Sequence, residues 1–435
     1  MMRRRSAAGA DRWGSAVKRY QACLTLAAQS ALLLVLTACG YHHHGYYYYP
    51  PPNMPPGGSD GSTPTGLIQG SDGSFYGTTA NGGRYGQGTF FRVTAAGAET
   101  VLYSFVGGSG DGASPEGVIQ ASDGNFYGAT SGGGIGGCQF GCGIAFKITP
   151  DGAESVLYFF SGAADGGDPN GLIQGSDGNF YGTAAYGGVA NSACGPAGCG
   201  VVFRLTPAGV ESVLYSFTGG AADGAIAASL IQGKDGNFYG VTAYGGPSND
   251  GTVFKVTAAG AETLLHSFAG GADGAVPQTP LAQGSDGNLY GTTPLGGTDA
   301  SGIVFRITLA GVESVLHAFG GGADGAQPFT SVIQGSDGNL YGTTSAGGDA
   351  ACPGGCGIVF KLTPAGAESA LYLFTASANS GGQPPQPASL LQGGDGNFYG
   401  TTSAGGQFGQ GTLFKLTPAG AETVLYSFGT NPTNP

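Results

Sequence analysis

Six cysteines form three close pairs, and thiols at such spacing can make either local disulfides or metal sites. The pairs are Cys138 with Cys142, Cys194 with Cys199, and Cys352 with Cys356. In an oxidising compartment, neighbouring cysteines in Gly-rich loops form disulfides readily. A zinc site would need further ligands, and no histidine accompanies the pairs. We therefore expect three disulfides that stiffen their loops.

An aspartate followed by glycine recurs in five Gly-rich segments, where its carboxylate could contribute to a calcium site. This series comprises Asp111, Asp165, Asp223, Asp273 and Asp324. Calcium loops need a dense pattern of oxygen ligands, which these segments lack. Turn formation explains Asp-Gly pairs without an ion, because Asp bonds its own backbone and Gly accepts a positive φ. The five residues are weak calcium candidates, and no metal or cofactor is predicted.

Signals for catalysis are poor. Only His266 and His317 lie beyond the N-terminal segment, and both stand where other repeats have a tyrosine such as Tyr215. They are interpreted as packing variants. No nucleophile elbow, zinc-protease helix or phosphate-binding loop is present. An enzyme, a hydrolase or lyase that acts on an extracellular polysaccharide or lactone, stays open as an alternative, but no catalytic residue is assigned.

These residues belong to a unit that occurs seven times. The segment Gln-x-x-Asp-Gly-Asn-Phe-Tyr-Gly recurs with small variations every 51 to 58 residues. Its aspartates are Asp72, Asp123, Asp177, Asp235, Asp286, Asp337 and Asp395. Within the third unit, β-branched and aromatic runs predict strands near 171–174, 180–183, 201–206 and 212–217. Turns are expected at 176–179 and 207–209.

Seven units of four short strands predict an all-β protein, a seven-bladed β-propeller of four-stranded antiparallel blades. Apolar residues lie on both faces of strands such as 101–105, as expected for a sheet packed between two neighbours. A β-solenoid is the alternative. Residues 66–428 would form the propeller and 429–435 a C-terminal tail. If each unit is one blade, the ring closes by side-chain packing without exchange of a strand.

Each third strand carries one base, and an acid follows seven residues later. The bases are Arg92, Lys147, Arg204, Lys255, Arg306, Lys361 and Lys415, and the acids are Glu99, Glu154, Glu211, Glu262, Glu313, Glu368 and Glu422. Across a tight hairpin we expect the two to lie on the same face as diagonal ion pairs. Exposed pairs of this kind contribute at most about 1 kcal/mol each.

Sequence variation is concentrated in two connections of the unit, those after the second and the fourth strand, which lie at the same rim. Rigid scaffolds commonly carry binding residues on such loops. The candidate ligand-binding residues there are Arg84, Tyr85, Phe140, Tyr186, Tyr244, Asn249 and Asp250. A glycan or another envelope protein is the expected class of ligand.

Charge is distributed unevenly along the chain. The formal net charge is −12, although Arg3, Arg4, Arg5, Arg12, Lys18 and Arg19 all lie in the first nineteen residues. The remaining body is strongly acidic and would repel a phosphate backbone, so nucleic-acid binding is not expected.

The N-terminal region is typical of an export signal. A basic segment precedes the apolar run at 31–36, which is too short to span a membrane. The run Leu36-Thr37-Ala38-Cys39 looks like the lipobox of bacterial lipoproteins. That resemblance implies removal of residues 1–38, lipid on Cys39 and an exported location in the cell envelope, with the outer membrane favoured because Gly40 follows. Residues 39–65 form a His-, Tyr-, Pro- and Gly-rich tether.

The repeated motifs Gly-Leu-Ile-Gln-Gly-Ser-Asp-Gly-Asn-Phe-Tyr-Gly-Thr and Gly-Thr-Val-Phe-Lys-Val-Thr resemble the GloVer (Gloeo_Verruco) tandem repeat over residues 66–428. Proteins of that kind are bacterial surface proteins with varied anchors, and the resemblance implies no activity. A weaker likeness to NHL-type blades supports the propeller and places the first strand nearest the axis.

Overall fold

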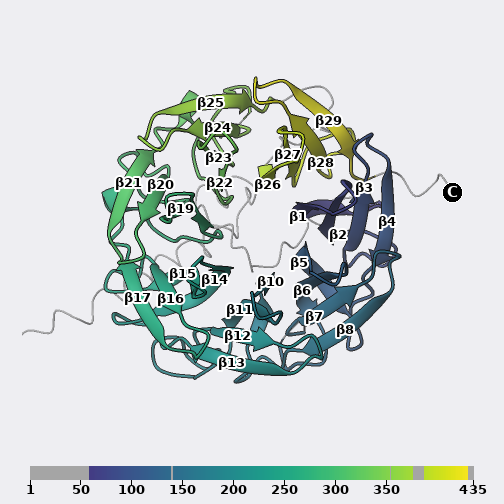
Figure 1. Ribbon diagram of the computed structural model, residues 1–435, viewed down its shortest axis with the longest axis vertical. Helices are drawn as coiled ribbons and strands as arrows, with labels where there is room; N and C mark the ends of the chain where they lie inside the picture. The colour runs from purple at the N-terminus through teal and green to yellow at the C-terminus, as the bar shows by residue number, and fades with distance from the viewer. Residues whose placement is uncertain (1–57, 139–140, 353, 376–386, 430–435) are drawn as a thin grey trace, which may run out of the picture. The chain divides into compact units, whose positions relative to one another are not determined.

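The protein is a ring of seven four-stranded antiparallel sheets, a seven-bladed β-propeller (Figure 1). The computed structural model describes residues 58–138, 141–352, 354–375 and 387–429. Cys39, Phe140, the predicted signal and residues 430–435 of the predicted C-terminal tail lie outside these residues. Among the described residues, no helix is long and apolar enough to cross a membrane. The predicted fold class is confirmed.

The strands of the first four blades have the following bounds. Blade 1 contains β1 (Ser62–Gln69), β2 (Phe75–Asn81), β3 (Thr89–Val93) and β4 (Glu99–Ser104). Blade 2 contains β5 (Gly112–Gln120), β6 (Phe126–Gly133), β7 (Ile144–Ile148) and β8 (Glu154–Phe159). Blade 3 contains β9 (Gly167–Pro169), β10 (Ile173–Gln174), β11 (Phe180–Tyr186), β12 (Val201–Leu205) and β13 (Glu211–Ser216). Blade 4 contains β14 (Gly224–Gln232), β15 (Phe238–Gly245), β16 (Thr252–Val256) and β17 (Glu262–Ser267).

The remaining blades follow the same order. Blade 5 begins with the short helix η1 (Gly271–Asp273) and contains β18 (Ala282–Gln283), β19 (Leu289–Thr293), β20 (Ile303–Ile307) and β21 (Glu313–Ala318). Blade 6 begins with η2 (Gly322–Asp324) and contains β22 (Ile333–Gln334), β23 (Leu340–Thr343), β24 (Ile358–Leu362) and β25 (Glu368–Leu373). Blade 7 contains β26 (Pro387–Gln392), β27 (Phe398–Thr402), β28 (Thr412–Leu416) and β29 (Glu422–Ser427). We call the four strand positions of a blade A to D, from the axis outward.

Apolar residues on both faces of the middle strands fill the spaces between blades. Strand C shows the pattern clearly, since in β16 every residue except Lys255 is buried. Aromatic rings of strand B stack from one blade to the next, as in Tyr127 on Phe180 at 4.2 Å and Tyr181 on Phe238 at 4.1 Å between ring centroids. Such contacts give a propeller seven interblade cores rather than one central core.

The A–B and C–D turns form one rim, which we call the turn rim, and a side-chain network repeats around it. In blade 3, Asp177 accepts hydrogen bonds from the backbone N–H of Asn179 and from the hydroxyl of Tyr181, at 3.1 and 2.7 Å. The side chain of Gln174 accepts a bond from Ser122 of the preceding blade at 2.9 Å. The equivalent glutamine bond occurs at all seven junctions, ending with Gln69 on Gly394.

The predicted ion pairs between strands C and D are wrong. The register places Arg92 opposite Thr100 and Val93 opposite Glu99, so Arg92 and Glu99 lie on opposite faces. The strand C bases instead approach the aspartates of the turn rim. The observed pairs are Arg92–Asp72, Lys147–Asp123, Lys361–Asp337 and Lys415–Asp395, at 3.5, 3.6, 2.9 and 3.3 Å. Next to the turn, the register of this hairpin pairs residues at even separations, six for Val93 with Glu99 and eight for Arg92 with Thr100, so residues seven apart fall on opposite faces.

The ring closes between blades 7 and 1 without strand exchange. Phe75 packs on Tyr399 and Phe91 on Phe428, with ring centroids 4.2 and 4.9 Å apart, as the prediction of closure by packing requires. Hydrogen bonds add to it, because Asp60 accepts the hydroxyl of Tyr426 at 2.6 Å. The first blade thus begins ahead of the expected residue 66, with β1 at Ser62 and Asp60 already in place.

Candidate functional site

The B–C and D–A loops form the second rim, which we call the loop face, and backbone hydrogen bonds hold it. The N–H of Gly134 in a B–C loop donates to the carbonyl oxygen of Asp111 in a D–A loop at 3.0 Å. The N–H of the residue near the start of strand A donates to the B–C loop of the preceding blade, as Asp168 does to Cys142 at 3.0 Å. Because these bonds involve only backbone atoms, the side chains of the loop face can vary.

The residues at those strand A positions have an unusual backbone. Thr63, Ser114, Asp168, Ile226, Val276 and Gln327 all have φ between 53° and 59°. A non-glycine residue in this region is strained, and the strain is maintained only where surrounding bonds impose it. Here the bond to the neighbouring blade imposes it. Sequence reasoning missed this ring of six, although the proline that follows five of its members was a signal.

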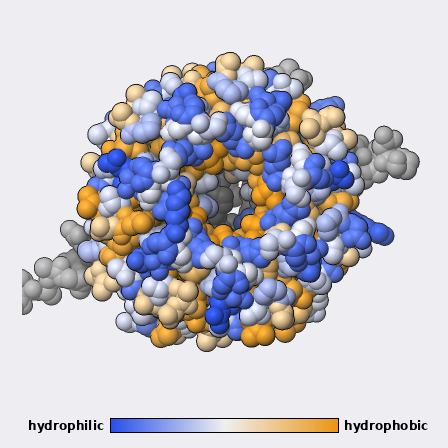
Figure 2. Space-filling model, in the orientation of Figure 1, coloured by the Kyte–Doolittle hydropathy of each residue, from blue (hydrophilic) through white to orange (hydrophobic). Residues whose placement is uncertain are grey.

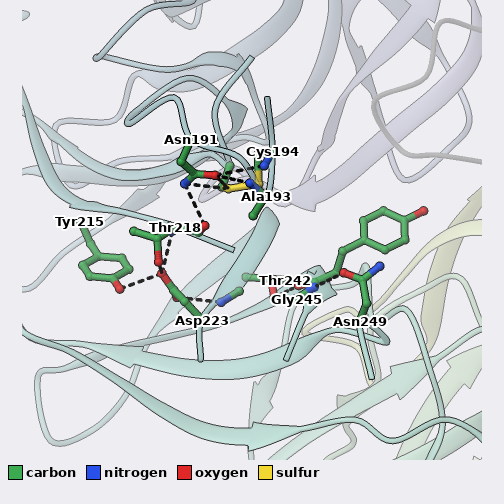
Figure 3. The surroundings of a disulfide bond; sticks show 12 residues. Asn191, Ala193, Cys194, Tyr215, Thr218, Asp223, Thr242, Gly245 and Asn249 are labelled. Atoms are coloured by element: carbon green, nitrogen blue, oxygen red, sulfur yellow. Dashed lines mark hydrogen bonds between the residues drawn. A yellow bond between two sulfur atoms is a disulfide. The ribbon is translucent and has the colours of Figure 1, made fainter. Parts of the chain in front are cut away.

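All three predicted disulfides are present, and all lie in B–C loops. Cys138–Cys142, Cys194–Cys199 and Cys352–Cys356 have Cα–Cα distances of 5.1, 5.3 and 5.6 Å. In blade 3 the side chain of Asn191 supports the bridge: its amide donates to the carbonyl of Thr218 at 2.8 Å and its oxygen accepts from Cys194 N–H at 3.1 Å (Figure 3). The bridged loops therefore present their side chains from a fixed frame, and the disulfides indicate an exported protein.

Exposed large apolar side chains of the loop face are distributed over four successive blades. Following the ring from blade 7 to blade 3, they are Phe408, Tyr85, Val106, Ile135 and Val189. Their exposed fractions range from 37% for Phe408 to 67% for Ile135. Among the described residues of blades 4, 5 and 6, no large apolar side chain of the B–C loops is exposed to this degree. We call these five residues the apolar arc.

A shallow depression adjoins the apolar arc at blade 1. Its lining includes Arg84, Tyr85, Leu102, Tyr103 and Val106, and its volume is about 330 Å³. The guanidinium of Arg84 lies over the ring of Tyr85, 5.6 Å from its centroid, which is an attractive cation–π geometry. The structure thus brings together two of the residues predicted to bind ligand.

The other predicted binding residues lie elsewhere on the loop face. Tyr186 ends β11, Tyr244 lies near the end of β15, and both are partly buried. Asn249 accepts a bond from Gly245 N–H at 3.1 Å through its side chain, so it shapes its own loop (Figure 3). Burial and the nearby Asp273 raise the pKa of Asp250. These four residues of blades 3 and 4 do not join the depression at blade 1.

The Asp-Gly residues of the D–A loops occupy an equivalent place at successive blade junctions. Asp111 accepts the hydroxyl of Tyr103 at 2.9 Å and the N–H of Val106 at 2.6 Å. Glu154 of the next blade approaches the same group, and burial together with the charge of Asp111 raises its pKa to about 7. We call each such group an interblade cluster: a strand D aromatic, the D–A loop aspartate and the first glutamate of the next strand D.

Interblade clusters recur around the ring with one systematic change. Tyr158 bonds to Asp165 at 2.9 Å and Tyr215 to Asp223 at 3.0 Å, as Tyr103 does to Asp111. Asp60 is the matching residue at the closing junction and was missed as a member of the Asp-Gly series, although Ser59-Asp60-Gly61 has the right sequence and spacing. At the junctions that follow blades 4 and 5, His266 and His317 replace the tyrosine.

Two acids lie on innermost strand segments of neighbouring blades, and the space-filling view shows an opening at the centre of the ring (Figure 2). Glu116 lies in β5 and Asp168 in β9 of the neighbouring blade. Burial raises the pKa of Glu116 to about 7. Burial and the charge of Glu116 also hold the pKa of Asp168 well above its ordinary value. Two neighbouring carboxyl groups whose pKa values are raised by burial are an arrangement that general acid–base chemistry uses.

Solved structures similar to this chain share its fold at low sequence identity. A streptogramin B lyase matches with a TM-score of 0.54 and 15% identity, over 83% of this chain and 94% of that one. Virginiamycin B lyase from Staphylococcus aureus matches with a TM-score of 0.52 and 14% identity, over 82% and 94%. A puromycin-hydrolysing peptidase of Mycobacterium tuberculosis matches with a TM-score of 0.52 and 11% identity, over 86% and 56%. These likenesses concern the fold alone.

No curated protein matches the sequence. The model of the Gloeobacter/Verrucomicrobia repeat, in contrast, matches three overlapping stretches, residues 62–284, 135–356 and 271–435. Together they cover every blade of the propeller, in agreement with the resemblance read from the repeated motifs. The chain is a member of the Gloeobacter/Verrucomicrobia repeat family.

Proposed function

We propose that this chain is an exported, lipid-anchored binding protein that holds another envelope protein on the loop face of its propeller. The apolar arc is the observation that carries the proposal. Apolar side chains that are exposed on the same face of a protein are typical of an interaction site, and here they occur on four successive blades. Aliphatic side chains such as Ile135 and Val189, together with Tyr85, suit a protein surface better than a sugar ring.

The disulfides and the tether support the same proposal. Two of the three bridged loops adjoin Ile135 and Val189, so these side chains lose little conformational freedom when a partner binds. The proposed lipid on Cys39 would leave the propeller on a spacer beside the membrane, where envelope proteins are available. The Cys39→Ser variant is expected in the soluble fraction, and the unchanged chain in the membrane fraction.

Binding is tested with two matched pairs of variants. Ile135→Ser with Val189→Ser alters the apolar arc, where these residues are 67% and 55% exposed. Val210→Ser with Val312→Ser alters residues of comparable exposure, 64% and 66%, on the turn rim. After cross-linking in cells, we expect a stoichiometric protein partner that the first pair loses and the second retains. Equal yields from both variants would contradict the loop-face assignment. Thermal stabilisation of the purified chain by envelope glycans that the first pair abolishes would replace the protein partner with a glycan.

A second function is favoured by the axial acids. Glu116 and Asp168 would act as a hydrolase or lyase pair on an extracellular polysaccharide or lactone, and burial raises the pKa of both carboxyl groups, as general acid–base catalysis requires. Turnover of such substrates that disappears in Glu116→Gln and persists in the Ile135→Ser, Val189→Ser protein would establish this function. Absence of turnover across a panel of polysaccharides and lactones would leave the binding role.

A further inference from the structure

Two neighbouring interblade clusters contain a histidine where the others have a tyrosine. The first consists of His266 in β17, Asp273 in η1 and Glu313 in β21. The second consists of His317 in β21, Asp324 in η2 and Glu368 in β25. Each therefore draws one nitrogen and two oxygen donors from the outer strands of two blades and the loop that connects them.

The donor atoms are close enough to share one ion. In both clusters the three ligand atoms lie within 4.8 Å of one another. The Nε2 of His266 is 3.3 Å from Oδ1 of Asp273, and that of His317 is 3.0 Å from Oδ1 of Asp324. Around a tetrahedral zinc ion with bonds of about 2.0–2.2 Å, neighbouring ligand atoms lie about 3.3–3.5 Å apart. The two His–Asp separations come within a few tenths of an ångström of that spacing, and the glutamate oxygen of each cluster lies within 4.8 Å of both.

Neighbouring groups fix the orientation of the ligands. The N–H of Ala269 donates to Oδ2 of Asp273 at 2.7 Å, and that of Gly320 to Oδ2 of Asp324 at 2.5 Å, so Oδ1 faces the histidine. The imidazole of His266 is held edge-on to Phe268 with centroids 4.9 Å apart, and His317 has the same contact with Phe319 at 4.8 Å. Outer contacts of this kind set the direction of first ligands in metal sites.

Some polar atoms at these two junctions lack a hydrogen-bond partner, although Nε2 of His317 is hydrogen-bonded to Oδ1 of Asp324 at 3.0 Å. Nε2 of His266 and Oε1 of Glu313 are buried without a hydrogen bond, as is Oε1 of Glu368. A buried polar atom without a partner is costly. The glutamate oxygen is unpartnered at several tyrosine junctions too, such as Glu154 and Glu211. Only the histidine junctions add a nitrogen that can complete a set of metal ligands.

We propose that each of these two interblade clusters, which we call histidine clusters, binds one divalent transition-metal ion, with zinc as the preferred metal. Imidazole nitrogen suits zinc and its neighbours, whereas calcium prefers oxygen donors only. A water molecule would supply the fourth ligand, as in zinc sites that have three protein ligands. The two ions would clamp blade 4 to blade 5 and blade 5 to blade 6 on the outer wall. The competing interpretation is an imidazolium ion paired with two carboxylates, which binds no metal.

The tyrosine junctions supply the matched substitution. His266→Tyr and His317→Tyr each restore the side chain found at neighbouring junctions, where tyrosine bonds to the aspartate, so the variants are expected to fold. All proteins carry His42, His43 and His44 changed to Ser, which removes other imidazoles. After chelation and dialysis against ZnCl₂, elemental analysis is expected to give two zinc ions per chain where His266 and His317 are both retained. One ion is expected in each single variant and none in the double variant His266→Tyr, His317→Tyr. Zinc should raise the melting temperature of the unaltered chain and leave the double variant unchanged.

A gain of binding gives an independent check. Tyr215→His places an imidazole beside Asp223 and Glu262 at the junction of blades 3 and 4 and is expected to add a third zinc ion. Cobalt substitution provides a spectroscopic readout, since visible bands of four-coordinate Co²⁺ should appear in proportion to the number of histidine clusters. Zinc binding that is absent in the unaltered chain, or that persists in the folded double variant, would overturn the proposal.

Discussion

The turn rim and the loop face are built from the same seven repeats but are held by different kinds of bond. On the turn rim, the hydrogen bonds are made by side chains. Asp177 accepts a bond within its own turn, and Gln174 accepts one from the preceding blade. On the loop face, backbone groups do it, as in the bond from Gly134 to Asp111. A network made of side chains fixes the sequence, whereas a network made of backbone atoms leaves the side chains free to vary. Variation on one face is thus a consequence of how that face is supported.

The turn rim and the interblade clusters shift the pKa of their carboxylates in opposite directions. At the turn rim, hydrogen bonds from Asn125 and Tyr127 outweigh the opposing effect of burial and hold the pKa of Asp123 at about 2. At the interblade cluster, burial dominates and raises the pKa of Glu154 to about 7. Every blade contains one acid of each kind, so the ring should respond to acid and to base through different residues.

The largest loss of stability is expected from replacing a tyrosine that belongs to both the turn rim and an interblade core. Tyr181 is fully buried, stacks on Phe238 and bonds to Asp177. Tyr181→Ala should lower the free energy of unfolding by about 3–5 kcal/mol, as other large-to-small core changes do. Tyr181→Phe, which removes the hydroxyl alone, should cost about 1 kcal/mol. Tyr85→Ala on the loop face should cost about 0.5 kcal/mol or less.

Denaturant unfolding followed by circular dichroism measures all three changes. The comparison between the two regions would fail if Tyr85→Ala were as destabilising as Tyr181→Ala. Equal effects of Tyr181→Phe and Tyr181→Ala would show instead that the hydroxyl and its bond to Asp177 matter more than ring packing.

A smaller effect is expected from opening a disulfide on the loop face. The Cys194–Cys199 bridge closes a short loop, for which loop-closure entropy predicts a contribution of about 2 kcal/mol. Because the loop can open without unfolding the blade, the double Cys→Ser variant should lose protection from hydrogen exchange mainly at residues 190–199. The unbridged B–C loop of blade 4 serves as the internal control. Uniform loss of protection across blade 3 would mean that the bridge supports the whole sheet.

Much of the fold could be predicted because the same pattern of strands and turns recurs seven times in the sequence. In blade 3 the observed β11, β12 and β13 overlap their predicted ranges, and the turns at Gly178 and Gly209 have the expected positive φ. Strand A was less predictable, since in blade 3 it is divided between β9 and β10. The division depends on the strained Asp168 and its bond to another blade, which a local pattern does not contain.

The candidate site was less predictable than the fold. Cysteine spacing sufficed for the disulfides, because the partners are neighbours in the chain. The interblade clusters join residues about fifty positions apart, such as His266 and Glu313, so neither member predicts the other. The misplaced ion pairs show the same limit at short range: whether Arg92 faces Glu99 depends on hairpin register, which the turn sets and a residue count does not.

The smallest predicted effect concerns the pH dependence of an interblade cluster that has tyrosine. Glu154 faces Asp111 and Tyr103, and its pKa of about 7 lies above the value of about 4.3 expected in the unfolded chain. Between these two values the folded state binds more protons than the unfolded state, so stability falls as pH rises. Solvent screening reduces the loss to about 1 kcal/mol, complete above pH 7. Glu154→Gln should therefore match the unaltered chain at pH 4 and exceed it in stability at pH 8.

Asp123→Asn provides the opposite case. The lowered pKa of the Asp123 carboxylate contributes stability that is present at pH 8 and lost as the pH falls from about 4 to about 2. If Glu154→Gln were destabilising at pH 8, the glutamate would be ionised and favourably paired there, and the contrast between the two kinds of carboxylate would not hold.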